Sequence, residues 1–298
     1  MYERLIRMLK MNDVEYKENQ KLSSYSSIKI GGKAGLFVMP DTTEKLVSVL
    51  QCLKNDGYPF KLVGKMTNLL PPDEDIDIPI VTTRRISGFK IDGCGEVVAN
   101  TGESLSRILH TAADKNFGGA ESLSGIPGTI GGLITMNAGA FGSEISGFFS
   151  EAVLYDIDKM TRRRASYADM RFSYRSSAVR GSSLVVLSVT LKLKRKSRQK
   201  VLSDIELYRQ RRRSTQPNEP SLGSVFMRQG EIVPARLIDE LGFRGFGIGG
   251  ACVSEKHAGF IVNRGGASAN DFKLLTEYIK SEALAHFGVA LQEEVEYL

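Results

Sequence analysis

The sequence predicts an α+β fold, because strand-type and helix-type patterns are grouped differently along the chain. Residues 33–64 read as strand, helix, strand, which is typical of a small α/β unit. Residues 150–195 contain three β-type segments in succession, as expected for a meander. Residues 267–289 have the apolar spacing of one long amphipathic helix. The chain has 298 residues, 42% of them apolar, which suffices for two or three domains with real cores.

The N-terminal part predicts two helices and two strands. In chain order these are a helix from the start followed by a polar connection to about residue 21, a strand at 33–40, a helix at 41–57, a strand at 60–64 and a turn cluster at 64–72. Asp41 or Thr42 is the expected cap of the second helix, and Gly57 is its expected end. Pro40 stops the strand before it.

The rest of the chain predicts mainly strands up to residue 195 and mainly helices after it. The expected elements are β-type segments at 78–83, 88–93 and 96–102, a helix at 104–119, a glycine-rich segment at 121–147, β-type segments at 150–158, 163–177 and 182–195, a helix and exit linker at 196–216, a helix at 234–243, strands and turns at 245–265, a helix at 267–289 and a strand at 291–298. Pro217 and Pro220 mark a boundary, since residues before proline avoid helical backbone.

Composition excludes several classes of protein. No window approaches the roughly 18 apolar residues of a membrane span, and the first ten residues lack the apolar run of a leader, so we expect a cytoplasmic protein. The cysteines and histidines stand far apart: Cys52, Cys94, Cys252, His110, His257 and His286. This spacing supports neither a disulfide framework nor a metal site.

The net charge of +6 permits nucleic acid, a membrane surface or an anionic small molecule as partner. The basic residues gather at 192–200 and 209–213, where the alternative interpretation is a solvated helix face or linker. The chain has no Trp and no aromatic ladder beside these runs. We therefore expect no nucleic acid partner, and a basic nucleic-acid-binding protein remains the less favoured alternative.

The segment at 121–147 carries seven glycines and almost no charge. It fails the spacing of the dinucleotide motif GxGxxG, and the chain has no GxxxxGK[ST] phosphate loop. What remains is main chain that could lie against a flat or diphosphate-bearing ligand through its amides. A tight turn packed inside the fold is the alternative.

Several motifs carry a family resemblance. They are SGIPGTIGG, MNAGAFG, FSYRSS, LGSVF, VSEKHAGFIVN and GVALQEEV, with SSYSSIKIGGKA near the start. In this order and at similar spacing, from about residue 23 to 296, they resemble the flavin-dependent UDP-N-acetylenolpyruvoylglucosamine reductases of bacterial peptidoglycan synthesis. The short stretch between LGSVF and VSEKHAGFIVN resembles the shorter form of that family, which lacks an extra substrate-covering insertion.

This resemblance implies a two-part FAD-binding unit of the vanillyl-alcohol-oxidase type followed by a C-terminal α+β substrate-binding domain. The expected boundaries are 1–84 and 85–200 for the two FAD-binding subdomains and 201–298 for the substrate-binding domain. It also implies the reaction, in which NADPH reduces FAD and the reduced flavin converts an enolpyruvyl ether to UDP-N-acetylmuramate. The alternative is a diverged flavoprotein of this fold, with another substrate or without FAD.

The resemblance implies that two segments hold the FAD, largely through backbone donors. The expected residues are Gly64, Thr67, Asn68, Ser124, Gly125, Ile126, Pro127, Gly128, Thr129, Gly131, Gly132, Asn137, Ala138 and Gly139. One position departs from the family pattern GxGSN, because Met66 stands where a glycine is usual. A positive φ at Met66 would cost about 1 kcal/mol or more.

The catalytic residues that the resemblance implies also suit the chemistry. Hydride addition builds negative charge on the substrate carboxylate, and the planar, always charged guanidinium of Arg175 fits that role. Ser224 is the implied proton donor, and Glu294, flanked by Glu293 and Glu296, is implied to assist at the same carboxylate.

Further residues are expected around the substrate. Arg228 and, more weakly, Arg212 are candidates for the diphosphate, and Tyr174 for the same cleft. His257 is expected to be structural, although an acid or base role is the alternative.

Overall fold

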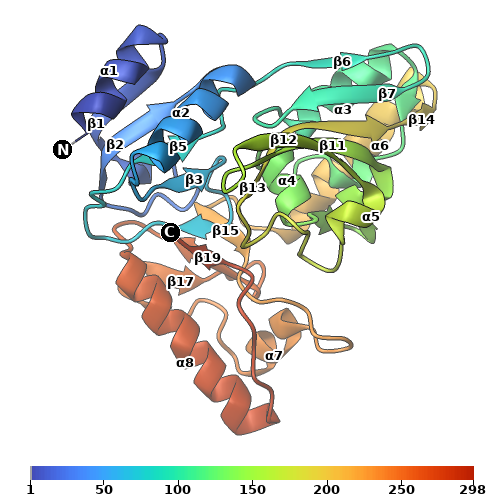
Figure 1. Ribbon diagram of the computed structural model, residues 1–298. Helices are drawn as coiled ribbons and strands as arrows, with labels where there is room; N and C mark the ends of the chain where they lie inside the picture. Colours follow the sequence, from blue (N-terminus) through green and yellow to red (C-terminus); the bar gives the residue numbers. More distant parts are fainter. Residues whose placement is uncertain (1) are drawn as a thin grey trace. The chain divides into compact units, whose positions relative to one another are not determined.

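The computed structural model describes residues 2–298 (Figure 1). The chain forms two compact units that interleave in sequence. Unit 1 contains the chain up to Glu18 together with Leu36–Lys65 and Ile78–Gln210, and unit 2 contains Asn19–Gly35, Met66–Asp77 and Arg211–Leu298. The three consecutive domains expected from the sequence stay a prediction.

A four-stranded sheet in the order β1-β2-β5-β3, on which α2 packs, belongs mainly to unit 1, although β1 and β2 cross its boundaries (Figure 1). Its elements are α1 (Glu3–Met11), β1 (Glu15–Lys21), β2 (Lys33–Met39), α2 (Thr43–Asn55), β3 (Lys61–Val63) and β5 (Ile80–Thr82). The strand, helix, strand prediction is confirmed, with β2 and β3 both parallel to β5. Thr42 is the cap of α2, since its Oγ1 accepts a hydrogen bond from the Lys45 amide at 3.2 Å.

The prediction of a polar connection after the first helix is wrong. Residues Glu15–Lys21 form β1, which is an edge strand of this sheet. Five of its seven residues are exposed and none is buried, so the segment has no apolar alternation to reveal it. An edge strand with charged residues on it is a common protection against aggregation.

The second part of unit 1 is a five-stranded antiparallel sheet in the order β12-β11-β13-β7-β6. The strands are β6 (Phe89–Ile91), β7 (Glu96–Asn100), β11 (Phe149–Asp156), β12 (Thr161–Ser166) and β13 (Leu184–Lys192), and the helices are α3 (Leu105–Asp114), α4 (Ile130–Thr135), α5 (Tyr167–Met170) and α6 (Arg198–Thr215). Short strand pairs join β8 (Phe117–Gly118) to β14 (Lys194–Arg195) and β9 (Gly139–Ala140) to β10 (Ser143–Glu144). Apolar side chains of α3, α4 and the sheet share one core.

The β-type segment expected at 163–177 is only partly a strand. The chain leaves β12 at Ser166 and forms α5, because Ser166 and Asp169 make a capping box. Arg171 then ends this helix in left-handed backbone, with φ +45°. Residues 172–177 are therefore a loop, which carries Arg175.

Unit 2 contains a four-stranded antiparallel sheet in the order β15-β18-β17-β16 and the long helix α8. Its elements are β4 (Leu69–Leu70), β15 (Ser221–Ser224), α7 (Pro234–Glu240), β16 (Gly247–Ile248), β17 (Ala251–Val253), β18 (Phe260–Asn263), α8 (Ala269–Phe287) and β19 (Glu296–Tyr297). The core of unit 2 also includes Ile28, Ile30 and Leu70 from far earlier in the chain. The strand expected at 291–298 is confirmed only as β19, which pairs in parallel with β4.

No helix within residues 2–298 combines the length and the apolar content needed to cross a bilayer. The same residues contain no cluster of three or more His, Cys, Asp or Glu side chains suited to a metal ion. Cys52, Cys94 and Cys252 are free thiols.

Candidate active site

The glycine-rich segment forms an irregular turn in unit 1 just before α4. Gly125 and Gly128 have φ values of +82° and +146°, which glycine adopts at little cost. Across the described residues 2–298, the main-chain amides of these two glycines donate no hydrogen bond. Both glycines are at least partly exposed, so their N–H groups are available to an anionic ligand.

Gly64 brings the end of β3 against this segment. A Cβ at Gly64 would lie 2.8 Å from Thr129 Oγ1, so the contact requires glycine. The Thr129 hydroxyl also caps α4 by accepting from the Gly132 amide at 3.2 Å. Gly131 packs even more closely, since its Cβ would lie 2.1 Å from Thr101 Oγ1. Two of the segments expected to bind FAD are therefore adjacent within unit 1.

Two cationic side chains lie in the same unit beside Gly64. Burial lowers the pKa of Lys65, and repulsion from Arg84 lowers it further, while Glu103 opposes the shift. A bound diphosphate would relieve this repulsion. The free amides, the glycine contact and the paired cations together fit the diphosphate of FAD.

Arg175 lies at the tip of a tight turn in unit 1. Ser173 and Ser176 exchange two main-chain hydrogen bonds of 3.1 Å, which leaves Tyr174 and Arg175 between them. The backbone of Arg175 is left-handed, with φ +54°, which costs a non-glycine residue about 1–2 kcal/mol. Such strain is concentrated at functional sites, where the surroundings hold it in place.

The guanidinium of Arg175 has defined partners within unit 1. Its Nη2 donates to the Gly139 carbonyl at 3.2 Å, and the group lies 4.8 Å from the ring centroid of Tyr174. The Tyr174 side chain is 45% exposed, so this pair faces solvent. Gly139 and Tyr174, predicted for cofactor and substrate, are thus both neighbours of Arg175.

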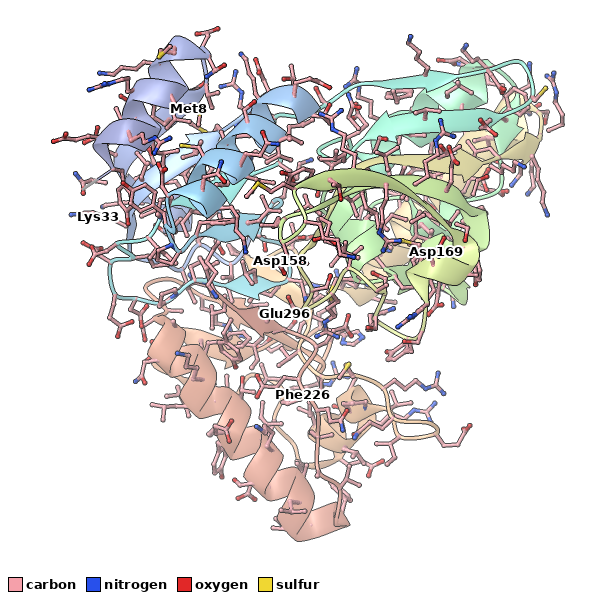
Figure 2. All side chains as sticks on the ribbon, in the orientation of Figure 1. Met8, Lys33, Asp158, Asp169, Phe226 and Glu296 are labelled. Carbon is pink, nitrogen blue, oxygen red and sulfur yellow. The ribbon has the colours of Figure 1, made fainter. Side chains whose placement is uncertain are left out.

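Ser224 and Glu294 lie on neighbouring segments of unit 2. Ser224 ends β15 and is exposed, and it follows Gly223 at φ +83°. The Glu294 amide donates to the Val225 carbonyl at 2.7 Å, and Phe226 pairs with Glu293. Figure 2 labels Phe226 and Glu296, which mark these two segments. The structure thus brings the backbones of two predicted catalytic residues together.

The neighbouring carboxylate Glu293 has a different role from Glu294. Lys280 Nζ binds its Oε1 at 3.1 Å, and the Tyr297 hydroxyl donates to its Oε2. Glu293 is therefore tied into unit 2, which favours Glu294 as the catalytic carboxylate. Arg175 belongs to unit 1, so the meeting of Arg175, Ser224 and Glu294 stays a prediction.

Thr67 and Asn68 belong to unit 2. Asn68 Nδ2 donates to the Glu294 carbonyl at 2.9 Å, and the Asn68 carbonyl accepts from the Glu296 amide at 3.0 Å. Asn68 thus supports the segment that carries Glu294. Its predicted contact with the FAD diphosphate stays a prediction, as does that of Thr67.

The two arginines predicted to bind the substrate diphosphate both make hydrogen bonds within the chain. Arg228 is exposed, and its Nε donates to the Gly230 carbonyl at 3.1 Å. Arg212 Nη1 donates to Gln216 at 3.2 Å within unit 2, and burial lowers its pKa. Their predicted contacts with substrate stay predictions.

Among the residues predicted to bind FAD, Ser124 is buried, while Ile126, Pro127 and Ala138 are partly or fully exposed.

His257 behaves as a structural residue. Its Nδ1 accepts from the Gly259 amide at 3.1 Å, which leaves the ring proton on Nε2. Its ring also packs edge-on against Phe260, at 4.9 Å between centroids. Burial lowers the pKa of His257, so the ring is neutral at pH 7.

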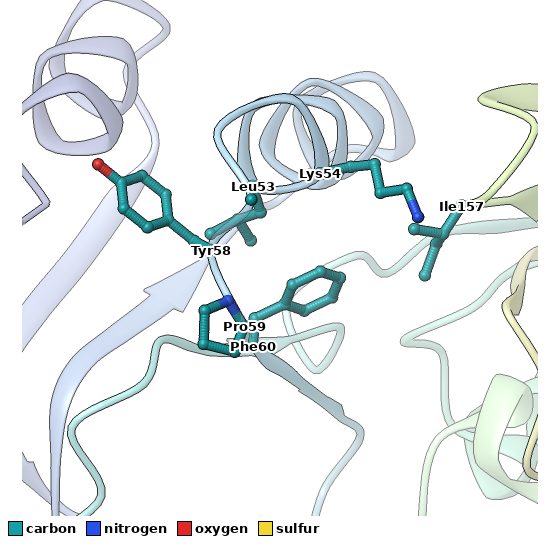
Figure 3. A pocket seen from close by; sticks show the side chains of 7 residues that line it. Leu53, Lys54, Tyr58, Pro59, Phe60 and Ile157 are labelled. Atoms are coloured by element: carbon teal, nitrogen blue, oxygen red, sulfur yellow. The ribbon is translucent and has the colours of Figure 1, made fainter.

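A hollow elsewhere in unit 1 contains none of the predicted site residues. It lies between the end of α2 and the loop that follows β11 (Figure 3). The lining residues are Leu53, Lys54, Gly57, Tyr58, Pro59, Phe60 and Ile157. Among the lining side chains, the one cation that could bind a diphosphate is Lys54, whose Nζ already binds Asp158 at 2.6 Å.

The structure reveals supporting residues that the sequence analysis missed. Glu144 binds Asn137, and the buried hydroxyl of Ser177 donates to the Thr135 carbonyl at 2.9 Å. Arg180 Nη1 donates to the Arg175 carbonyl at 3.0 Å. Ser177 lies within the motif at 172–177, and Glu144 and Arg180 lie close to the motifs at 136–142 and 172–177, which was a weak signal. Their contacts depend on the folded chain.

Met66, which stands where the family pattern usually has glycine, has a positive φ. Its φ is +49°, and only 4% of its surface is exposed. The Met66 carbonyl accepts from the amide and the hydroxyl of Ser27, at 3.2 and 3.3 Å. The strain is therefore real, and a buried side chain offsets it.

Two variants at Met66 are expected to separate strain from burial. Met66→Gly relieves about 1 kcal/mol of strain but loses a buried side chain worth about 2–5 kcal/mol, so urea unfolding should shift to lower concentration. Met66→Ala loses nearly the same burial and keeps the strain. It should therefore be less stable than Met66→Gly by about 1 kcal/mol, and FAD dissociation constants should follow the same order. Equal stability of the two variants would contradict a left-handed Met66.

Comparisons with known families agree with these two regions. The FAD binding domain family matches residues 34–155, and the family of the UDP-N-acetylenolpyruvoylglucosamine reductase C-terminal domain matches residues 216–298. A UDP-N-acetylenolpyruvoylglucosamine reductase of Caldicellulosiruptor bescii is 37% identical over 97% of this chain and 93% of its own length. The enzyme of this name from Thermotoga maritima is 39% identical over 93% of this chain and 96% of its own.

Solved structures lead to the same family. The crystal structure of UDP-N-acetylenolpyruvylglucosamine reductase from Thermus caldophilus has a TM-score of 0.79 and 27% identity, covering 95% of this chain and 98% of that one. A berberine bridge enzyme variant, with a TM-score of 0.51 and 13% identity, covers 65% of this chain and 44% of its own and shares the fold alone. The fold is thus α+β, with a FAD-binding part of the vanillyl-alcohol-oxidase type and a C-terminal domain of its own. The chain belongs to the family of UDP-N-acetylenolpyruvoylglucosamine reductases.

Proposed function

We propose that this chain reduces UDP-N-acetylglucosamine enolpyruvate to UDP-N-acetylmuramate, with FAD as cofactor and NADPH as hydride donor. The observation that carries the proposal is similarity to reductases of this name over nearly the whole chain, 97% in one case. The filled catalytic positions Arg175, Ser224 and Glu294 support it. The reaction is a step of peptidoglycan precursor synthesis, and we place it in the cytoplasm, where UDP-sugar precursors are made.

FAD would be held by the Gly64 and Gly125–Gly128 main chain, with Lys65 and Arg84 beside the diphosphate. The bound flavin supplies hydride transfer between NADPH and the β carbon of the substrate. Across the carbon–carbon double bond, one hydride and one proton are added, and NADPH is oxidised. This chain must therefore supply a charge partner for the carboxylate and a proton for the α carbon.

Arg175 would bind the substrate carboxylate as negative charge builds on it. Its left-handed backbone and its hydrogen bond to Gly139 restrict the guanidinium before substrate arrives. Ser224 would hold its Oγ proton towards the α carbon, and Glu294 would act at the same carboxylate. Tyr174, Arg228 and Arg212 would contact the substrate, the two arginines through its diphosphate.

The purified protein tests this function directly. We expect flavin absorbance, loss of that absorbance on anaerobic addition of NADPH, and its return on addition of the enolpyruvyl substrate. Return of absorbance only with other acceptors would favour a diverged flavoprotein, and absence of bound FAD would contradict the reductase function. Steeply salt-dependent binding to nucleic acid would instead favour the basic-protein alternative.

A further inference from the structure

Arg175 needs support that its own turn does not supply. The left-handed backbone at φ +54° is unfavourable for arginine, so contacts from outside the turn must hold it. The turn lies between Ser173 and Ser176, whose mutual hydrogen bonds fix its width but not its direction. Arg180 supplies one such contact, since its Nη1 donates to the Arg175 carbonyl at 3.0 Å. Further support comes from the segment 137–144, which lies between α4 and the end of β10.

Asn137 is the centre of this support. Its side chain is 1% exposed, and Nδ2 donates to the Ser173 carbonyl at 2.9 Å and to Glu144 Oε2 at 2.8 Å. Its Oδ1 accepts from the Ser146 amide at 3.2 Å. Both amide hydrogens are therefore used inside the protein, and neither is left for a cofactor.

The same segment also holds the guanidinium. The Gly139 carbonyl accepts from Arg175 Nη2 at 3.2 Å. A Cβ at Gly139 would lie 2.7 Å from the Ser143 carbonyl oxygen, 3.0 Å from Glu144 Cγ and 3.3 Å from Arg175 Nη1, so Glu144 and Arg175 both pack closely against this glycine. The segment thus holds the turn at two points: Asn137 binds the Ser173 carbonyl at its start, and the Gly139 carbonyl binds the head group of Arg175.

We propose that Asn137, held by Glu144, is a positioning residue for Arg175 and not a ligand of FAD. Asn137 fixes the Ser173 carbonyl, and the turn that begins there directs the guanidinium to the Gly139 carbonyl and the substrate carboxylate. This inference rests on the proposed function of Arg175, and it differs from the cofactor role that the family resemblance implies for Asn137.

The test separates the two half-reactions of the FAD-loaded enzyme. In Asn137→Ala, reoxidation of the reduced enzyme by the enolpyruvyl substrate is expected to fall by about 10²-fold, as misplacement of a catalytic group by about 1 Å can cause. FAD dissociation and reduction by NADPH should stay within about twofold of wild type, on the magnitudes expected for a group that touches neither. Asn137→Asp should be worse, since its carboxylate would face Glu144 and the Ser173 carbonyl.

A double variant distinguishes positioning from general damage. In an Arg175→Ala background, Asn137→Ala should add less than about twofold, because the residue that it positions is gone. Asn100→Ala is the matched control, since the Asn100 side chain also donates to a main-chain carbonyl, that of Ser87, at 3.0 Å. It should leave both half-reactions unchanged. A full additional loss in the Arg175→Ala background, or an FAD dissociation constant raised about tenfold or more by Asn137→Ala alone, would overturn the proposal.

Glu144→Ala provides a second route if the buried Asn137 variants fail to fold, because Glu144 is only half-buried. Its crystal structure as the holoenzyme is expected to show the contact between Arg175 Nη2 and the Gly139 carbonyl broken; an unchanged contact would overturn the proposal. This crystal structure needs no substrate, so it tests the positioning role of Asn137 independently of the reaction. Failure of the wild-type enzyme to reduce the enolpyruvyl substrate would count against the proposed function alone.

Discussion

Replacing Ser224 with alanine is expected to leave reduction of the bound FAD by NADPH intact and to slow its reoxidation by the enolpyruvyl substrate by about 10²-fold or more. The physical reason is that only the second half-reaction needs a proton at the α carbon. Ser224 is exposed at the end of β15, next to Gly223 in left-handed backbone, so its hydroxyl is accessible without packing into the core. Stopped-flow absorbance of the flavin measures both half-reactions separately.

Ser221→Ala is the matched control for this prediction. Ser221 lies on the same strand, and its main-chain carbonyl, which the substitution keeps, accepts from the Ser27 hydroxyl at 2.6 Å. Both half-reactions should keep their wild-type rates in Ser221→Ala. Equal losses of the two half-reactions in Ser224→Ala would mean that Ser224 acts on the flavin or on the fold, and its role as proton donor would be wrong.

The elements that could be predicted are those with local chemical signals. The helix expected at 267–289 is observed at Ala269–Phe287, because Ser268 and Asp271 form its capping box and Gly288 ends it at φ +66°. The edge strand at 15–21 could not be predicted, since it has no apolar face. Ile28 and Ile30 gave no sign that they join the core of unit 2, because that depends on packing against residues such as Phe226 nearly 200 positions later.

The candidate site also contains features that the sequence could predict and features that it could not. Motif resemblance predicted Arg175, Ser224 and Glu294 as catalytic residues, and the glycine content singled out the segment in which two main-chain amides donate no hydrogen bond within residues 2–298. The sequence could not show that Asn68 and Asn137 direct their amide groups at main-chain carbonyls, those of Glu294 and Ser173. An asparagine side chain serves a ligand or the backbone equally well, so only the folded neighbours decide between them.

Arg175→Ala and Glu294→Ala are each expected to lower turnover by about 10²-fold, as the loss of one electrostatic contact in the transition state typically does. Arg175→Lys should recover only part of the loss, because an ammonium keeps the charge but lacks the planar paired donors. Each loss should appear in the reoxidation half-reaction, where negative charge builds on the substrate carboxylate.

The local structure provides a control for each of these substitutions. Arg171→Ala removes an exposed arginine at φ +45°, which directly precedes the loop of Arg175, and Glu293→Gln alters the carboxylate that Lys280 and Tyr297 already bind. Arg171→Ala should keep wild-type turnover. Glu293→Gln should lower the free energy of unfolding of unit 2, with only a small effect on turnover. A closed complex with substrate in which Arg175 or Glu294 lies more than about 10 Å from Ser224 would exclude a direct role for that side chain, since hydrogen-bond reach is about 3 Å.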